Sequence, residues 1–270
     1  GDPGISKSVM LNSVIKRVPK ARIVVGTKSS RAGLGAMVVK DELLGTWGLE
    51  IGALALTNNS TLAIDELDKM YKENLSELLE PMSAGTITIN KAGIHASLPA
   101  RTSILASANP IHGNFDLKQP LSRQIDLPSP ILNRFDLIFV LIDRANTEID
   151  AKSVDYIFDS MTKGRKVDIT PEFFKKYISY CRKLTPILSE DLREPLKEFY
   201  VNLRKLSFGD TEKGLPVNLR NFEGWVRLAE ANAKLRLANK VEKQDLDIAK
   251  KIFMFCLKQV GIDSETGLID

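Results

Sequence analysis

The first eight residues of the chain, GDPGISKS, combine glycine, lysine and hydroxyl side chains in an order suited to phosphate binding. A phosphate loop needs backbone N–H groups that point inward, a lysine for the β- and γ-phosphates and a hydroxyl for Mg²⁺. Gly1 and Gly4 permit the tight turn, and a helix expected over residues 9–18 would direct its positive N-terminal end at the phosphates. Ser6 departs from the glycine of the pattern GxxxxGK[ST], so this match by itself also fits a Gly-Pro turn before a helix.

Two carboxylates directly follow a short apolar segment further along the chain. Residues 62–64 predict a strand, and Asp65 and Glu66 stand at its end. In this position Asp65 would hold Mg²⁺ and Glu66 would polarise an attacking water. Acidic residues also suit the first turn of a helix, but their combination with the phosphate-loop pattern favours catalysis. Asn109 ends a further apolar segment and would hold a water or the γ-phosphate, although Asn-Pro is also a common turn.

These residues need a scaffold, and the apolar pattern predicts one. Short apolar runs at 23–25, 62–64, 103–107 and 137–142 predict strands, and residues 68–80 predict a helix between two of them. Residues 137–142 (LIFVLI) are apolar throughout, as in a strand buried on both faces of a parallel sheet. Later segments have helical periodicity, at 147–162, 171–183, 190–206, 218–238 and 243–260. The pattern predicts an α/β core over residues 1–145 and a helical domain over residues 146–270.

The composition excludes several classes of protein. Of 270 residues, 43% are hydrophobic and 27% charged, which argues against a disordered or fibrous protein. The net charge of +4 is only weakly basic, so any DNA contact must come from a few placed residues. Two Cys and two His are too few for a structural zinc site or a disulfide framework. No apolar run approaches the roughly 20 residues of a membrane span and no signal-peptide pattern is present, so we expect a cytosolic protein without a membrane partner.

Four segments together carry a resemblance to a known family. In chain order they are GDPGISKS, LAIDELDKM, ILASANP and ILNRFDLIFVL, and they resemble the ATPase domain of the archaeal minichromosome maintenance (MCM) replicative helicases. The resemblance extends from residue 1 to about residue 260. It implies an AAA+ P-loop NTPase fold, with a parallel sheet flanked by helices and an all-α lid, and ATP and Mg²⁺ as cofactors. It further implies a hexameric ring that holds single-stranded DNA in its channel and works in DNA replication, in the cytoplasm and associated with the nucleoid.

The resemblance also implies a role for each residue that matches a family motif. Asp65 and Glu66 are the Walker-B acids, Asn109 is sensor 1, and Ser8 and Asp65 hold Mg²⁺. Arg134 is the arginine finger that reaches the γ-phosphate of a neighbouring subunit, although it also fits a surface arginine. Arg220 is the sensor-2 candidate, and Arg227 is a weaker one. The remaining nucleotide contacts come from the phosphate loop: Gly1, Pro3, Gly4, Ile5, Ser6, Lys7 and Ser8.

Two family insertions have counterparts in the chain. Alternating β-branched residues followed by a Gly-containing turn predict a hairpin near residues 86–99. This hairpin resembles the presensor-1 hairpin, whose tip lysine tracks the DNA backbone, and Lys91 would be that lysine. Residues 36–47 match the position of the helix-2 insertion, a second channel loop. His95 and His112 lack partners at ligand spacing. The aromatic side chains of the predicted helix 171–183 are expected in the lid core: Phe173, Phe174, Tyr177 and Tyr180.

Departures from the family pattern leave alternatives open. Residues 83–85 are Ser-Ala-Gly where the family has Glu-Gln-Gln, Asn133 replaces a serine, and the strand that precedes the phosphate loop in the family is not part of the sequence. We therefore keep two further hypotheses. One is a related AAA+ remodelling ATPase of the chelatase type that does not bind DNA. The other is a catalytically inactive ring or scaffold subunit.

Overall fold

A three-stranded parallel sheet forms the centre of the N-terminal part of the protein. The computed structural model describes residues 1–40, 45–91, 93–116, 119, 123–162, 168–207 and 217–259. Strands β1 (Arg22–Val25), β4 (Thr61–Asp65) and β7 (Ser103–Ala106) are ordered β1-β4-β7, with Ala63 opposite both Ile23 and Leu105. The central strand β4 is buried over Leu62, Ala63 and Ile64. The carboxyl ends of parallel strands share one edge of a sheet, so residues that follow β4 and β7 lie close together.

Helices and short turns surround this sheet, and the path of residues 68–80 differs from the predicted helix. The segment 68–80 is not a single helix, because a 3-10 turn ends at Lys69, Tyr71 is extended and the helix that follows covers only Lys72–Ser76. Leu67, Leu75 and Leu78 are buried from these separate short turns, so packing of the leucines rather than helical periodicity decides the path. The elements are α1 (Lys7–Arg17), η1 (Gly26–Lys28), α2 (Arg31–Leu34), α3 (Ala53–Leu56), η2 (Leu67–Lys69), α4 (Lys72–Ser76), α5 (Pro81–Ala84) and α6 (Ser129–Leu132).

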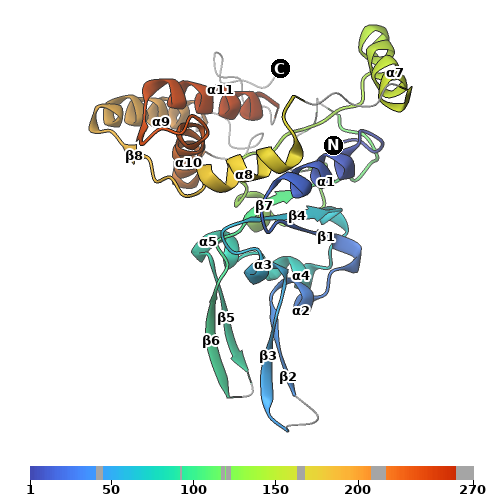
Figure 1. Cartoon of the computed structure of the whole chain (residues 1–270), viewed down its shortest axis with the longest axis vertical. Helices are drawn as coiled ribbons and strands as arrows, with labels where there is room; N and C mark the ends of the chain where they lie inside the picture. The colour runs from blue at the N-terminus through green and yellow to red at the C-terminus, as the bar shows by residue number, and fades with distance from the viewer. Residues whose placement is uncertain are drawn as a thin grey trace.

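Two β-hairpins extend from the same side of the core (Figure 1). Strands β2 (Ala36–Lys40) and β3 (Trp47–Ile51) pair antiparallel, as do β5 (Thr86–Lys91) and β6 (Ile94–Pro99). Val38, Ile87 and Ile89 are buried and belong to the core cluster of the sheet. The predicted turn residue Ala92 and residues 41–44 of the predicted helix-2 insertion lie outside the described residues. The hairpin bases are therefore tied to the core, while their far ends extend away from it.

The apolar segment 137–142 was expected as a buried strand, and this prediction is wrong. Among the described residues the parallel sheet comprises only β1, β4 and β7, and Phe139 in this segment is 44% exposed. The backbone groups of Ile138 and Val140 bond to side chains instead. The N–H of Val140 donates to Gln259 (3.2 Å), and its carbonyl accepts from the same amide (3.0 Å). Cys256 bonds both backbone groups of Ile138 in the same way. Helix α11 (Lys243–Gln259) thus satisfies the groups that a neighbouring strand would otherwise bond.

The second part of the chain is helical, as predicted. It comprises α7 (Thr147–Thr162), α8 (Pro171–Cys181), β8 (Ile187–Leu188), η4 (Glu190–Leu192), α9 (Arg193–Ser207), α10 (Leu219–Leu235), β9 (Lys240–Val241) and α11. Thr170 caps α8 by accepting from the N–H of Phe173 (3.2 Å), and Pro171 occupies the first turn. Figure 1 shows α8–α11 beside the core and α7 standing apart from them. Among the described residues no helix combines the length and low charge needed to cross a bilayer.

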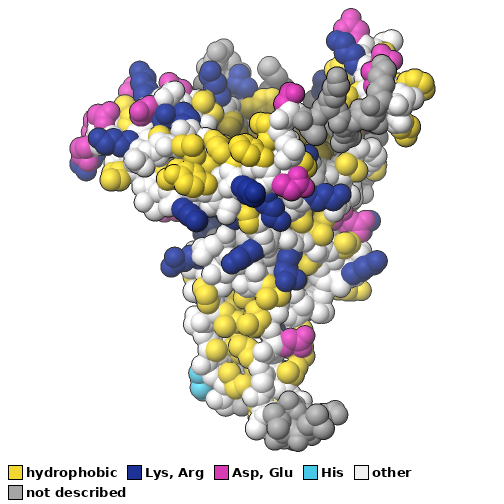
Figure 2. All heavy atoms as spheres, viewed as in Figure 1, with side chains coloured by type: hydrophobic (Ala, Val, Ile, Leu, Met, Phe, Trp, Pro, Cys, Tyr) yellow, Lys and Arg dark blue, Asp and Glu magenta, His cyan; other side chains and the backbone are white. Residues whose placement is uncertain are grey.

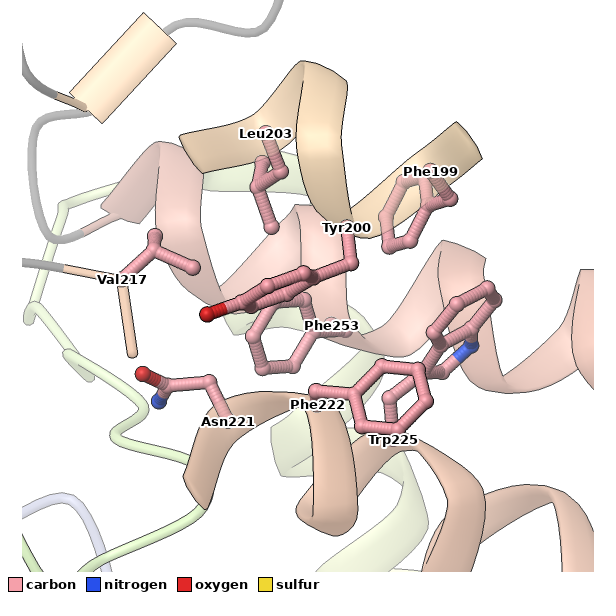
Figure 3. Close-up of a pocket in the computed structure, with 8 residues that line it drawn as sticks. All are labelled: Phe199, Tyr200, Leu203, Val217, Asn221, Phe222, Trp225 and Phe253. Carbon is pink, nitrogen blue, oxygen red and sulfur yellow. The ribbon is translucent and has the colours of Figure 1, made fainter. Parts of the chain in front are cut away.

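The core of the lid is built from α9, α10 and α11, not from α8. Figure 3 shows aromatic rings from these three helices around a small pocket. Phe199 packs on Trp225 with ring centroids 4.3 Å apart, and Tyr200 packs edge-on against Phe222 at 5.5 Å. Phe173 and Tyr180 of α8 are instead 61% and 57% exposed, so their expected place in the core is wrong. Helix α8 contacts α1 and α10, and these two rings stay exposed.

Candidate functional site

The loop that precedes α1 has the backbone of a phosphate-binding turn. Gly4 (φ +85°) and Ser6 (φ 60°, ψ 27°) are both left-handed, and the side chain of Ser6, the N-cap residue of α1, makes no capping hydrogen bond. The ammonium of Lys7 donates to the carbonyls of Gly1 (2.7 Å) and Asp2. Burial lowers the pKa of Lys7, against the opposing pull of nearby aspartates. A helix N-terminus, free N–H groups and a lysine thus meet at one point, which is the arrangement that binds an anion.

Asp65, at the end of β4, is held as a carboxylate next to this loop. Burial pushes its pKa upward, but hydrogen bonds from Ser107, Ser8 and the backbone N–H of Glu66, together with the Lys7 charge, hold the pKa below its usual value. The hydroxyl of Ser8 and the carboxylate of Asp65 therefore lie within hydrogen-bond reach of each other. Oxygen ligands of this kind are those that Mg²⁺ prefers. These residues fit a magnesium–nucleotide complex.

Glu66 is placed by an unusual backbone and by two polar neighbours. It adopts the left-handed conformation (φ 55°, ψ 48°), which is costly for a residue with a Cβ. Its carboxylate accepts from the ammonium of Lys69 (2.8 Å) and from the hydroxyl of Thr27 (3.5 Å). Gly26 approaches its backbone so closely that a Cβ there would lie 2.2 Å from the Glu66 carbonyl oxygen. The surrounding chain thus holds Glu66 turned away from the regular strand path.

The loop after β7 lies against the end of β4. The N–H of Ser107 donates to Ile64 (2.9 Å), and its carbonyl accepts from Leu67 (2.8 Å). The N–H of Asn109 donates to the carboxylate of Asp68 (3.0 Å), and Asn109 itself is half-buried. The structure therefore brings Lys7, Ser8, Asp65, Glu66 and Asn109 to one edge of the sheet.

Arg134 and Arg220 lie together at a different place. Arg134 donates to the hydroxyl of Ser83 (2.8 Å) and to the carbonyl of Pro130 (2.9 Å). Arg220 donates to the carbonyl of Met82 (3.1 Å). Among the described residues, none of these hydrogen bonds reaches the phosphate loop. Arg227, the weaker sensor-2 candidate, bonds Asp136 at 2.7 Å and so holds α10 to the core.

Lys91 is the last residue of β5 and is exposed, opposite Ile94. On the same hairpin, His95 contacts Asn90 at 2.9 Å between ring nitrogen and amide oxygen. Within the described part of the chain no group of three His, Cys, Asp or Glu side chains is arranged to bind a metal.

Three residues that sequence reasoning did not single out belong to this site. Asp2 is buried within the phosphate loop, Ser107 donates to Asp65, and Gly26 contacts the backbone of Glu66. Asp2 lies inside the phosphate-loop motif, where a charged residue between Gly1 and Pro3 could have indicated a specific role. The contacts of Ser107 and Gly26 join different strands, so no local pattern shows them.

The phosphate loop before a helix, the acids at a strand end and the helical lid define a P-loop ATPase domain of the AAA+ type. Models of two domains match the chain: the MCM P-loop domain over residues 1–161 and the MCM AAA-lid domain over residues 172–257. The chain belongs to the MCM family, as its sequence motifs predicted.

Curated relatives match the whole chain. It is 38% identical to the minichromosome maintenance protein MCM of Saccharolobus solfataricus and to the DNA replication licensing factor mcm4-B of Xenopus laevis. It is 37% identical to the licensing factor mcm4 of Schizosaccharomyces pombe. Each comparison covers all of this chain but only 40%, 32% and 30% of the length of the respective relatives. The chain thus spans less than half the length of these relatives.

Proposed function

We propose that this chain is the ATP-hydrolysing motor domain of a replicative DNA helicase. In this proposal, ATP is hydrolysed at the subunit interfaces of a hexameric ring, and the ring moves along single-stranded DNA in its channel. One observation carries the proposal. The residues suited to bind nucleotide lie together at the sheet edge, while Arg134 and Arg220 bond to the adjacent residues Ser83 and Met82 of α5. A single chain therefore holds two separate halves of an ATPase site.

On the nucleotide side, each residue has a role that its position supports. Lys7 and the N–H groups at the start of α1 would bind the β- and γ-phosphates, with Gly1, Pro3, Gly4, Ile5 and Ser6 forming the loop around them. Ser8 and Asp65 would hold Mg²⁺, which when bound supplies charge neutralisation on the phosphate oxygens. Glu66 would take up the proton of the attacking water, and Asn109 would orient that water.

On the arginine side, the geometry favours action on a neighbouring subunit. Figure 1 shows α5 on one side of the sheet and the start of α1 toward the other. A guanidinium is permanently charged and can donate two parallel hydrogen bonds to phosphate oxygens. Arg134 would act as the arginine finger and Arg220 as sensor 2, both completing the nucleotide site of the adjacent subunit.

DNA contact in this proposal depends on the hairpins. Figure 2 shows that lysine and arginine side chains form a band across the middle of the visible face and do not cover the hairpins. The weak net charge of +4 also argues against a generally basic DNA-binding surface. An exposed lysine at the end of β5, repeated around a ring, would place several ammonium groups on one strand. We propose Lys91 for this role.

The intact protein distinguishes the proposal from its two alternatives. A replicative motor should hydrolyse ATP and bind a single-stranded oligonucleotide with an affinity that falls as salt is raised. ATP hydrolysis without such binding would favour a chelatase-type remodelling ATPase. Absence of hydrolysis in an assembled ring would favour a scaffold subunit. We place this activity on chromosomal DNA, in the cytoplasm and at the nucleoid of an archaeal-type cell. The boundary near residue 145 between the α/β core and the helical domain stays a prediction.

A further inference from the structure

A buried carboxylate in the phosphate loop has no part in the roles assigned so far. Asp2 is only 2% exposed and lies five residues before Lys7 in the chain. One carboxylate oxygen accepts from the N–H of Phe115 (2.8 Å), and the other accepts from the N–H of Asp143 (2.9 Å). Its own N–H donates to the carbonyl of Leu141 (2.9 Å). Asp2 therefore bonds two segments that are far from it in sequence.

Each of these segments leads to another part of the site. Phe115 follows Asn109 on the loop that leaves β7, and the nitrogen of Gly1 also bonds this loop, at the Ala108 carbonyl (2.8 Å). Residues 141–143 continue the segment that begins just after Arg134. The carbonyl of Asp2 accepts from Lys7, so the backbone that carries the Asp2 carboxylate also contacts the phosphate-binding ammonium.

We infer that Asp2 is a positioning residue for nucleotide binding, which fixes the phosphate loop against the Asn109 loop and the 137–143 segment. This inference rests on the proposed ATPase function. A carboxylate suits the position because both partners are donors, and two acceptor oxygens satisfy both without a proton of their own. Hydrogen bonds to a charged acceptor are stronger than neutral ones, and a buried donor that loses its partner is costly.

The substitution Asp2→Asn tests this inference without changing the volume of the side chain. The amide would turn an –NH₂ group toward one of the two N–H donors, so one bond becomes a contact between donors. We expect the KM for ATP of the intact protein to rise about 10- to 100-fold, with a smaller change in kcat. We also expect the amides of Phe115 and Asp143 to exchange hydrogen at least tenfold faster in the protein without nucleotide.

Asp245→Asn is the matched control. Asp245 is a fully buried carboxylate of the lid, bonded to Arg236, Asn232 and the N–H of Glu242. It should lower thermal stability while leaving the KM for ATP unchanged. If Asp2→Asn lowers stability but leaves the KM unchanged, or if both variants lose activity only in proportion to unfolded protein, the positioning role is wrong.

A second variant covers the case in which Asp2→Asn does not fold. Asp143→Pro removes one of the two N–H donors and keeps the Asp2 carboxylate, and it should raise the KM for ATP above that of the unsubstituted protein. An unchanged KM in this variant would overturn the inference. If the unsubstituted protein binds no ATP, the proposed function fails. Faster hydrogen exchange at Phe115 in Asp2→Asn would then show that Asp2 holds this segment structurally, without a part in nucleotide binding.

Discussion

Arg134 and Arg220 are bound to adjacent residues of α5: the first donates to the hydroxyl of Ser83 and the second to the carbonyl of Met82. The two arginines come from different parts of the fold, one following α6 and the other in the first turn of the lid helix α10. The contact of Arg220 with α5 depends on the docking of the lid against the core, which the ion pair between Arg227 and Asp136 (2.7 Å) also supports. A lid that shifts on the core would therefore move Arg220 relative to Arg134.

The position of Arg134 predicts complementation between inactive subunits. Arg134→Ala should abolish ATP hydrolysis, and so should Lys7→Ala. When the two variants are mixed, some interfaces pair an intact Lys7 with an intact Arg134 from the neighbour, so part of the activity should return. ATPase rates measured across mixing ratios check this. The double variant Lys7→Ala/Arg134→Ala, mixed with either single variant, serves as the control and should restore nothing. Persistent inactivity at every ratio, in rings shown to exchange subunits, would contradict action on a neighbour.

Glu66→Gln should separate ATP binding from hydrolysis. It removes the carboxylate that takes up a proton and leaves Asp65 and Ser8 available for Mg²⁺. We expect kcat to fall about 100- to 10,000-fold while ATP still binds. Turnover and equilibrium binding of ATP check this, with Glu73→Gln on the exposed face of α4 as the matched control. Near-normal turnover in Glu66→Gln would reject its assignment as the Walker-B base.

Lys91→Ala should weaken DNA binding and flatten its dependence on salt. Each phosphate neutralised on a single strand contributes about −0.7 to the slope of log K against log salt. We expect unwinding to fall severely while basal ATP hydrolysis remains, because Lys91 lies far along the hairpin from the phosphate loop.

The choice of control for Lys91 depends on the structure. Lys69 is unsuitable because its ammonium bonds Glu66 at 2.8 Å, so its loss would disturb the ATPase site. Lys251 is exposed on α11 and carries the same charge. If Lys251→Ala weakens binding as much as Lys91→Ala does, the hairpin lysine has no special part in DNA binding.

Gly26→Ala should impair ATP hydrolysis although Gly26 is not among the residues proposed to bind nucleotide. The added Cβ would lie 2.2 Å from the carbonyl oxygen of Glu66, so the backbone at Glu66 must move. We expect a loss of about 1 to 3 kcal/mol in the free energy of unfolding and a lower kcat. Chemical denaturation and turnover check this, with Gly48→Ala on β3, where a Cβ meets its nearest atom at 3.9 Å, as the control. Equal behaviour of the two variants would contradict the close contact.

Through Asp245, the free energy of unfolding should depend on pH. Its hydrogen bonds and ion pair with Arg236 hold its pKa below the usual value, against the effect of burial. A carboxyl with a lowered folded-state pKa stabilises the protein above its unfolded-state pKa, and that contribution is lost as the pH falls through the folded-state value. The free energy of unfolding should therefore fall below about pH 4. In Asp245→Asn the free energy of unfolding should be lower by about 3 to 5 kcal/mol at neutral pH, and it should depend less on pH. Urea denaturation at several pH values checks this.

Much of this protein was predictable from its sequence because the information is local. The family and the class of fold follow from four short segments in order: GDPGISKS, LAIDELDKM, ILASANP and ILNRFDLIFVL. Helical periodicity in the second half predicted the lid helices, because an amphipathic helix repeats its apolar positions whatever it packs against.

The tertiary structure decided what depends on partners distant in the chain. The segment 137–142 has the apolar pattern of a strand, yet its backbone bonds to Gln259 and Cys256 of α11. Aromatic spacing in α8 predicted a buried face but could not say which rings the neighbouring helices would cover, and Phe173 stays exposed. The bonds of Arg134 and Arg220 to adjacent residues of α5, and of Asp2 to Phe115 and Asp143, likewise join residues separated by many others. Local pattern predicts most of the helices and strands, whereas long-range packing and hydrogen bonding decide whether a segment such as 137–142 joins a sheet and where distant side chains meet.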